Sequence, residues 1–170
     1  MIDTARLKLI PATVALARAE IGDRSGFARL LGAVVPNNWP PEILADALPL
    51  FLGRLEAAPD QVGWFGWYAL AASDSAPVLV ASGGFTGPPQ AGTVEIGYSV
   101  LPQFQRRGYA TEVVVALTQW ALRQPVVTRV IAETEWANPA SVRVLEKAGF
   151  APCGRARESR GARFVFPGDA

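Results

Sequence analysis

Along the chain, short runs of alternating apolar and polar residues are interspersed with stretches whose apolar residues recur every three or four positions. The first pattern predicts strands, particularly where β-branched and aromatic residues are frequent, and the second predicts helices with one apolar face. The predicted strands are residues 4–10, 63–72, 77–85, 93–101, 129–134, 150–155 and 163–166. The predicted helices are residues 12–20, 24–33, 41–57 (with a kink or break at Pro49), 106–123 and 138–148.

Residues with special backbone preferences mark the ends of these elements. Residues 34–41 contain three prolines and two asparagines, which forbids regular structure there. Asp23 and Ser25 are the two candidate N-caps of the second helix, because both residue types accept a bond from a free N–H of the first turn. The polar turn at 73–75 joins the strands on either side of it, which predicts an antiparallel hairpin.

The order strand 93–101, helix 106–123 and strand 129–134 sets the topology. A helix that joins two neighbouring strands usually makes them parallel, and ligands of such sheets bind at the carboxyl ends of the strands, where loop 102–108 lies. The predicted fold is therefore α/β, with a mixed, mostly antiparallel central sheet of about six to seven strands. Helices are expected on both of its faces, with one parallel βαβ unit, and no linker divides the predicted single domain, residues 1–170.

Composition narrows the chemistry. Half of the residues are apolar, which argues against disorder, and the formal charge of +1 gives no field that would select nucleic acid or an anionic membrane. Without histidine there is no Ser-His-Asp triad and no histidine-ligated metal. Cys153 is alone, so no intrachain disulfide and no cysteine-only zinc site is expected. Carboxylates, hydroxyls, the backbone or a cofactor must supply the chemistry, and no metal is predicted.

Two further absences bear on location. The N-terminus lacks the basic-then-apolar pattern of a signal peptide. The most apolar run, residues 62–72, is too short for a bilayer, which needs about 20 residues. A cytoplasmic protein is therefore expected.

The loop between strand 93–101 and the following helix is the main candidate site. Its sequence, Gln105-Arg-Arg-Gly-Tyr-Ala110, lacks both the G-x-G-x-x-G dinucleotide fingerprint and the P-loop pattern. Free backbone N–H groups, the helix dipole and two arginines nevertheless favour an anion at this helix start. A phosphate-bearing ligand is predicted here, with either Arg106 or Arg107 pointing at a phosphate; the alternative is a solvated pair.

This hexapeptide, in its context, resembles the GNAT superfamily of acyl-CoA-dependent N-acyltransferases. The context is a preceding Glu-Ile-Gly-Tyr98, the pattern Glu133-x-x-x-x-Asn138-x-x-Ser141, a following Leu145-Glu-Lys-Ala-Gly-Phe150, and an N-terminal Thr-Ala-Arg-Leu-x-Leu. The combination is most similar to the branch of the ribosomal-protein alanine acetyltransferases, the RimJ/RimL type. The resemblance spans about residues 4–156 and is strongest over 93–150.

The resemblance implies that acetyl-CoA is the cofactor, bound as a co-substrate. Gly97 would mark a bulge that opens a slot for pantetheine, although a simple sheet irregularity is the alternative. The Val100 amide is the implied oxyanion donor. Asn138 is either only an N-cap or also a partner of the cofactor arm. The implied cofactor-binding residues are Tyr98, Ser99, Val100, Gln105, Arg106, Arg107, Gly108, Tyr109, Ala110, Thr111, Asn138 and Ser141.

Glu95 is the candidate general base. Acetyl transfer needs a neutral amine, and without histidine a carboxylate near the sheet centre is the natural proton acceptor. The alternative is a strand glutamate that faces solvent or pairs with an arginine. Ser141 either completes the helix cap or protonates the departing thiolate. Leu145 stands where many relatives have a tyrosine acid, so Ser141, water or no dedicated acid remain as alternatives. Trp39 and Trp136 are predicted to contact the acceptor, against the alternative that they are core residues.

These features predict an acetyltransferase that moves an acetyl group from acetyl-CoA to an amine by direct attack, the acceptor being a protein N-terminus or a small molecule. A non-catalytic acyl-CoA-binding or sensing module is the alternative. No nucleic-acid or membrane partner is expected. Small domains of this family often pair, so a homodimer is also expected.

Overall fold

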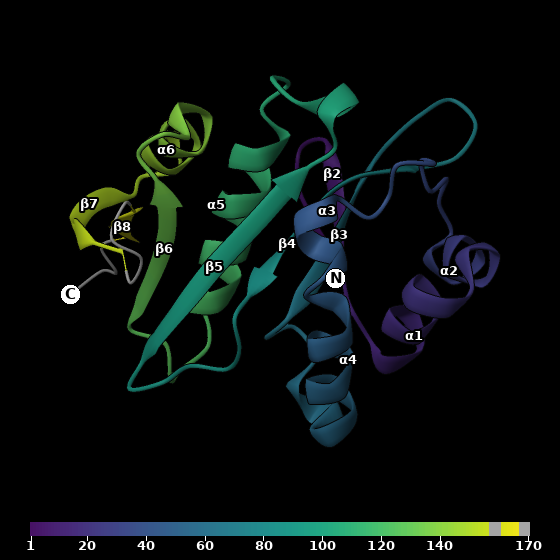
Figure 1. The fold of residues 1–170 in the computed structure, drawn as a ribbon, viewed down its shortest axis with the longest axis horizontal. Coiled ribbons are helices and arrows are strands. Elements are labelled where there is room, and N and C mark those ends of the chain that lie inside the picture. The colour runs from purple at the N-terminus through teal and green to yellow at the C-terminus, as the bar shows by residue number, and fades with distance from the viewer. Residues whose placement is uncertain (157–160, 167–170) are drawn as a thin grey trace.

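In the part of the chain that the structure describes, eight strands form one sheet in the order β1-β2-β3-β4-β5-β6-β8-β7 (Figure 1). The computed structural model describes residues 1–156 and 161–166, so the end of the predicted 1–170 domain lies outside the described residues. The strands are β1 (Ile2–Asp3), β2 (Leu7–Pro11), β3 (Gly66–Ala71), β4 (Val78–Phe85), β5 (Thr93–Val100), β6 (Arg129–Glu135), β7 (Ala151–Arg155) and β8 (Gly161–Phe166). The helices are α1 (Val14–Gly22), α2 (Arg24–Leu31), α3 (Glu42–Ala45), α4 (Leu48–Ala57), α5 (Tyr109–Leu122) and α6 (Pro139–Lys147), with 3₁₀ turns at Pro59–Gln61 and Pro102–Phe104.

The pairing confirms the predicted fold class. Among the described strands, β5 and β6 are parallel and every other neighbouring pair is antiparallel, including the hairpin β3–β4. The strand beyond the predicted seven is β1, which pairs with β2 through Ile2↔Leu9. Two residues are too few to show alternation, so the pattern of the sequence did not reveal it.

Each face of the sheet carries its own layer of helices. Along β3 the alternation of side chains sends Trp67 and Ala69 into the core under α5 and α6, and Tyr68 and Leu70 into the core under α1, α2 and α4. Figure 1 shows α5 behind β5, and α4 to the right of β5 on the viewer's side of the sheet. The predicted helices on both faces are confirmed, and the sheet separates a side that faces α5 from a side that faces α4.

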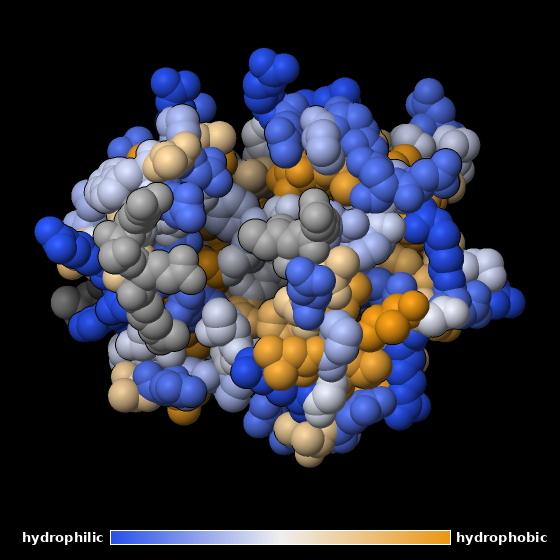
Figure 2. Space-filling model, in the orientation of Figure 1, coloured by the Kyte–Doolittle hydropathy of each residue, from blue (hydrophilic) through white to orange (hydrophobic). Residues whose placement is uncertain are grey.

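The helix predicted at 41–57 is divided into α3 and α4. Pro49 lies in the first turn of α4, where proline is tolerated because that N–H has no intrahelical partner. The break therefore comes before the proline rather than at it. The apolar surface in Figure 2 lies over this part of the molecule, and Leu50 on α4 is 55% exposed.

Of the two candidate caps of α2, Asp23 is the one used, since its Oδ1 accepts a bond from the Gly26 N–H at 2.9 Å. No helix in the described part of the chain is long and apolar enough to cross a membrane.

Candidate active site

The two parallel strands separate toward their carboxyl ends, as Figure 1 shows. They pair only at Thr93↔Arg129, Val94↔Val130 and Glu95↔Ile131, although β5 continues to Val100 and β6 to Glu135. The bulge expected at Gly97 is not present in the pairing with β4, whose register runs without a shift from Phe85↔Ile96 to Ala81↔Val100. The gap opens instead because β5 follows β4 while β6 turns away from it.

The backbone of β5 presents polar groups to this gap. At the two ends of the β4–β5 ladder, the Thr86 N–H donates to the Glu95 carbonyl at 3.0 Å and the Leu101 N–H donates to the Val80 carbonyl at 3.1 Å. Antiparallel pairing alternates, so odd-numbered β5 residues bond to β4 and even-numbered residues face away from it. The N–H groups of Tyr98 and Val100 therefore face the gap, whereas the main chain of Ser99 is turned to β4.

The loop before α5 presents a second set of free donors. Within the described residues, none of the backbone N–H groups of residues 106–111 donates to a protein acceptor, and the N-cap Gly108 offers no side chain to bond them. Arg106 and Gly108 have φ angles of 60° and 82°, in the left-handed region. This irregular path brings successive amides to the positive end of the α5 dipole, an arrangement that binds anions.

Arg6 holds this loop from the N-terminal segment. Its Nη1 donates to the Arg107 carbonyl at 2.7 Å, and its Nη2 lies 2.7 Å from Glu112 Oε2 on the first turn of α5. The guanidinium also lies 5.0 Å from the centre of the Tyr109 ring. Sequence reasoning missed this residue as part of the site, although it belongs to the N-terminal Thr-Ala-Arg-Leu motif. The bond to the Arg107 carbonyl fixes one peptide of the loop.

Glu112 is the other half of this support. Burial alone would raise the pKa of its carboxyl, but hydrogen bonds from Thr4 and Arg6 and the charge of Arg6 outweigh it, so the pKa is lowered. The Thr4 hydroxyl donates to Oε1 at 2.6 Å and the Arg6 N–H donates to the same oxygen at 2.8 Å. The carboxylate thus ties the N-terminal segment to the start of α5.

The two loop arginines are both exposed. The Arg107 guanidinium lies 5.7 Å from the centre of the Phe104 ring, while Arg106 occupies the left-handed position. Gln105 turns back to β5, where its Nε2 donates to the Val100 carbonyl at 3.1 Å. The loop and the end of β5 are therefore directly linked.

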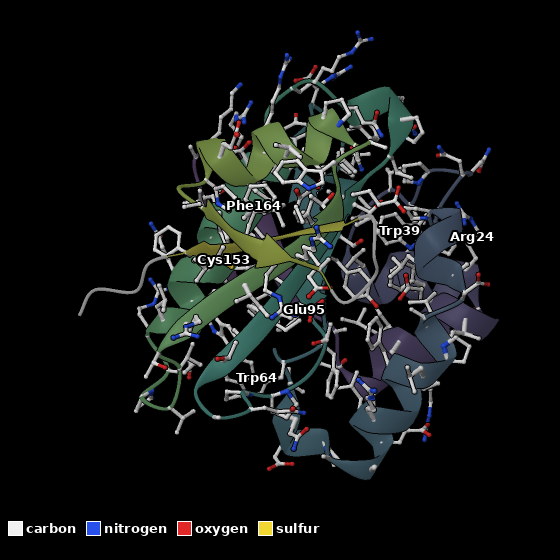
Figure 3. The ribbon with its side chains drawn as sticks, turned by 60° about the vertical axis from the view of Figure 1, so that its left-hand side comes forward. Arg24, Trp39, Trp64, Glu95, Cys153 and Phe164 are labelled. Atoms are coloured by element: carbon white, nitrogen blue, oxygen red, sulfur yellow. The ribbon has the colours of Figure 1, made fainter. Side chains whose placement is uncertain are left out.

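Glu95 lies at the point where β5 and β6 part. Its side chain is half-buried on the α4 side, because its neighbours Val94 and Ile96 fill the core on the α5 side. It lines a cavity of about 1060 Å3 that Arg54, Arg129, Cys153 and Arg163 also line. Figure 3 labels Glu95 and Cys153 of this set. A carboxylate at the base of the gap can take a proton from a nucleophile on this side.

Arg163 is the charged neighbour that the cavity brings to Glu95. Its pKa is raised chiefly by its hydrogen bond to Glu133, with smaller contributions from the charges of Glu133 and Glu95. Its Nη2 lies 2.7 Å from Glu133 Oε1 on β6. Arg163 thus puts a positive charge on the wall of the cavity that Glu95 also lines.

Tyr98 and Ser141 meet across the gap. The Tyr98 hydroxyl lies 2.7 Å from Ser141 Oγ, and either atom is a donor in that bond. Burial raises the pKa of Tyr98, so the phenol keeps its proton. Asn138 caps α6 by accepting from the Ser141 N–H at 3.1 Å. Leu145 is core, at 1% exposure, so the phenol nearest Ser141 comes from β5 rather than from α6.

The two candidate tryptophans have different surroundings. Trp39 is 4% exposed, and its Nε1 donates to Glu20 Oε1 at 2.8 Å, while Tyr68 donates to Glu20 Oε2 at 2.6 Å. Its ring does not line the cavity that Glu95 lines. Burial against Tyr68 makes Trp39 a core residue, which was the alternative interpretation of the sequence, and the predicted contact with an acceptor is not retained. Trp136 is 57% exposed at the carboxyl end of β6, and its role stays a prediction.

Comparisons with known proteins agree with this geometry. A family model described as "Acetyltransferase (GNAT) domain" matches residues 11–151. A curated relative, the uncharacterised N-acetyltransferase YjdG of Bacillus subtilis (strain 168), is 28% identical over 150 residues, which cover 88% of this chain and 89% of the relative.

Solved structures share the fold. An acetyltransferase of the GNAT family from Bacillus anthracis is 19% identical with a TM-score of 0.63, covering 96% of both chains. The structure of AAC(6')-Ib in complex with paromomycin and acetyl-CoA is 19% identical with a TM-score of 0.59, covering 96% of this chain and 93% of that one.

Proposed function

The chain belongs to the acetyltransferase (GNAT) family, and on that premise we propose that it transfers an acetyl group from acetyl-CoA to a primary amine. The proposal rests on two sets of free N–H groups, which lie close together at the carboxyl end of β5. The amides of residues 106–111 suit the pyrophosphate, and the β5 amides that face the gap suit the pantetheine arm. The side chains of Arg106 and Arg107 add positive charge beside the phosphates.

In this proposal the amine attacks the thioester carbonyl directly. The Val100 N–H donates to the oxygen that becomes negative in the tetrahedral intermediate, because its orientation toward the gap leaves it free to do so. Glu95 takes the proton that the amine loses, and the carbon–sulfur bond then breaks. Ser141, bonded to the Tyr98 phenol, donates a proton to the CoA thiolate. Ser141 then regains a proton from water as Glu95 releases its own, which restores both groups.

The finer assignment to the RimJ/RimL branch is part of the proposal and rests on the whole combination of motifs, from the N-terminal Thr-Ala-Arg-Leu-x-Leu to Leu145-Glu-Lys-Ala-Gly-Phe150. Arg6 of the first motif bonds to the Arg107 carbonyl in the loop before α5. A protein N-terminus and a small-molecule amine are both acceptors of this chemistry. AAC(6')-Ib, whose fold this chain shares, was solved with a small-molecule ligand.

The Glu95→Gln variant tests the proposal. At neutral pH we expect CoA release in the presence of an amine panel to fall about 100-fold to 10,000-fold, because general-base catalysis contributes roughly that factor. The dissociation constant of acetyl-CoA, measured by titration calorimetry, should stay within about twofold. Glu135→Gln, on the exposed end of β6, is the matched control and should keep its turnover. Unchanged turnover in the first variant would remove Glu95 as the base.

A non-catalytic acyl-CoA sensor is the second candidate, favoured by Leu145 at the position where many relatives have a tyrosine. A sensor would bind acetyl-CoA but release no CoA with any amine. The same calorimetry and turnover assay on the wild-type protein therefore separates the two functions.

A further inference from the structure

A second cavity, of about 290 Å3, lies between the sheet and the helices α1, α3 and α4. Its walls are largely apolar, with Leu44, Leu48, Phe51 and Phe65 among them, and it shares Phe65 with the cavity that Glu95 lines. At one end it touches the β5 segment 97–99, which borders the proposed cofactor slot. An acceptor that reaches the thioester from the α4 side can pass through this cavity.

Among the described residues that line this cavity, Glu20 is the one that carries a charge. Its carboxylate accepts hydrogen bonds from Trp39 and Tyr68, both of them neutral donors. Within the described part of the chain no lysine or arginine bonds to it. Burial and the neighbouring Glu20 raise the pKa of Tyr68, so the phenol remains a donor. A largely buried carboxylate is usually paired with a cation, and here the protein holds the group in place without supplying one.

The sheet register gives the spacing between the strand of Tyr68, the hydrogen-bond partner of Glu20, and the strand that borders the slot. Tyr68 pairs with Ser82 and Ser82 pairs with Ser99, so the three side chains form a row across β3, β4 and β5. Two strand spacings of about 4.8 Å put the Tyr68 end of the row about 10 Å from β5. The slot lies on the far side of β5. A group bound at Glu20 is thus too distant to be the amine that attacks the thioester.

We propose that the acceptor is a small diamine, one end of which docks at Glu20 as an ammonium while the other end, a primary amine, reaches the cofactor slot. Its spacer is apolar, because the cavity between the two ends is lined by leucine and phenylalanine. The cavity volume is at the low end of the roughly 300–1000 Å3 that ligand pockets span, which favours a compact molecule. The inference rests on the acetyl transfer proposed above.

The test compares α,ω-alkanediamines with alkylamines of matched chain length. With the wild-type protein, kcat/KM for a diamine of about six to eight carbons, whose nitrogens lie about two strand spacings apart, should exceed that for the matched monoamine about tenfold to hundredfold, the usual value of a hydrogen bond to a charged group. In Glu20→Gln, which keeps an oxygen for Trp39 or Tyr68, the preference should fall to about unity while monoamine turnover is retained. Glu56→Gln, an exposed glutamate paired with Arg18, should keep the preference.

The outcomes separate this inference from the function on which it rests. If calorimetry shows acetyl-CoA binding and both amine series are turned over equally, Glu20 does not bind an ammonium of the acceptor, and the acetyltransferase proposal still stands. A preference that survives in Glu20→Gln would do the same, and so would acetylation of peptide N-termini but not of diamines. Failure to bind acetyl-CoA and to acetylate any amine would overturn both. The wild-type comparison decides the question even if the Glu20 variant does not fold.

Discussion

The two sides of the sheet each hold a largely buried glutamate, and the two are compensated in opposite ways. Glu112, beside the cofactor loop, has Arg6 as a partner at 2.7 Å. Glu20, on the α4 side, has two neutral donors. The first carboxylate is neutralised by the protein, which leaves the loop amides and arginines to attract an anion. The second keeps its negative charge available for a cation. The difference matches the two proposed substrates, a pyrophosphate on one side and an ammonium on the other.

On the side of the cofactor loop, residues 105–110, the largest effect is expected from Gly108→Val. Gly108 has a φ of 82°, where a β-branched residue is strongly disfavoured, and a Cβ there would lie 3.2 Å from Arg6 Nη2. The loop must shift and its amides no longer converge, so we expect the dissociation constant of acetyl-CoA to rise about hundredfold. Calorimetric titration with acetyl-CoA measures it.

Gly53→Ala is the matched control, since this glycine lies inside α4 and an added methyl group would have nothing within 4 Å of it. Alanine is the better helix former, so this variant should be as stable as the wild type or up to about 1 kcal/mol more stable. Its affinity for acetyl-CoA should not change. Equal loss of affinity in both variants would show that the loop conformation is not the cause.

The next test concerns the other side. Trp39→Phe keeps an aromatic ring in the core but removes the donor to Glu20 Oε1. A buried oxygen that loses its partner costs about 1–3 kcal/mol, so the free energy of unfolding should fall by that amount in urea denaturation. Trp136→Phe, at an exposed position, should change it by no more than about 0.5 kcal/mol. If both variants lose similar amounts of unfolding free energy, the bond from Trp39 to the Glu20 carboxylate does not stabilise the protein.

The two sides also differ in how far the sequence alone could predict them. The unit from Glu95 to Ala110 is local: a strand, a glycine-containing loop and a helix start follow one another, and their roles depend on backbone geometry that short motifs report. The pair Arg6 and Glu112 joins residues 106 positions apart, and no periodicity encodes it.

The α4 side depends on such distant pairs throughout. Glu20 meets Tyr68 across 48 positions. Trp39, in a segment without regular structure, gave no signal of whether its ring faces the core or a ligand. The division of helix 41–57 also depends on packing, since proline is compatible with a helix start as well as with a kink.

A smaller effect is expected from Arg6→Ala. The variant loses the bond to the Arg107 carbonyl and the ion pair with Glu112, both made by a half-exposed arginine, while the loop amides remain. We expect acetyl-CoA affinity to fall about fivefold to tenfold, or about 1 kcal/mol. Arg18→Ala is a close control, because this exposed arginine also pairs with a glutamate, at 2.8 Å, away from the loop. If both variants bind acetyl-CoA equally well, Arg6 does not position the loop.

The smallest effect is in the pH dependence of stability, where the two glutamates should act with opposite sign. The pKa of Glu20 is raised above its ordinary 4.5 by burial, which its two hydrogen bonds only partly offset. The folded state therefore binds more protons than the unfolded state just above pH 4.5, and the Glu20 contribution to stability declines as the pH rises through that window. The pKa of Glu112 is lowered, so its contribution is present above pH 4.5 and is lost as the pH falls below it.

Urea unfolding from about pH 3 to pH 8 should show the wild type losing stability relative to Glu20→Gln on the alkaline side of 4.5, and relative to Glu112→Gln on the acid side. Parallel curves for all three proteins would mean that neither carboxylate differs in protonation between the folded and unfolded states, and the electrostatic contrast between the two sides would be lost.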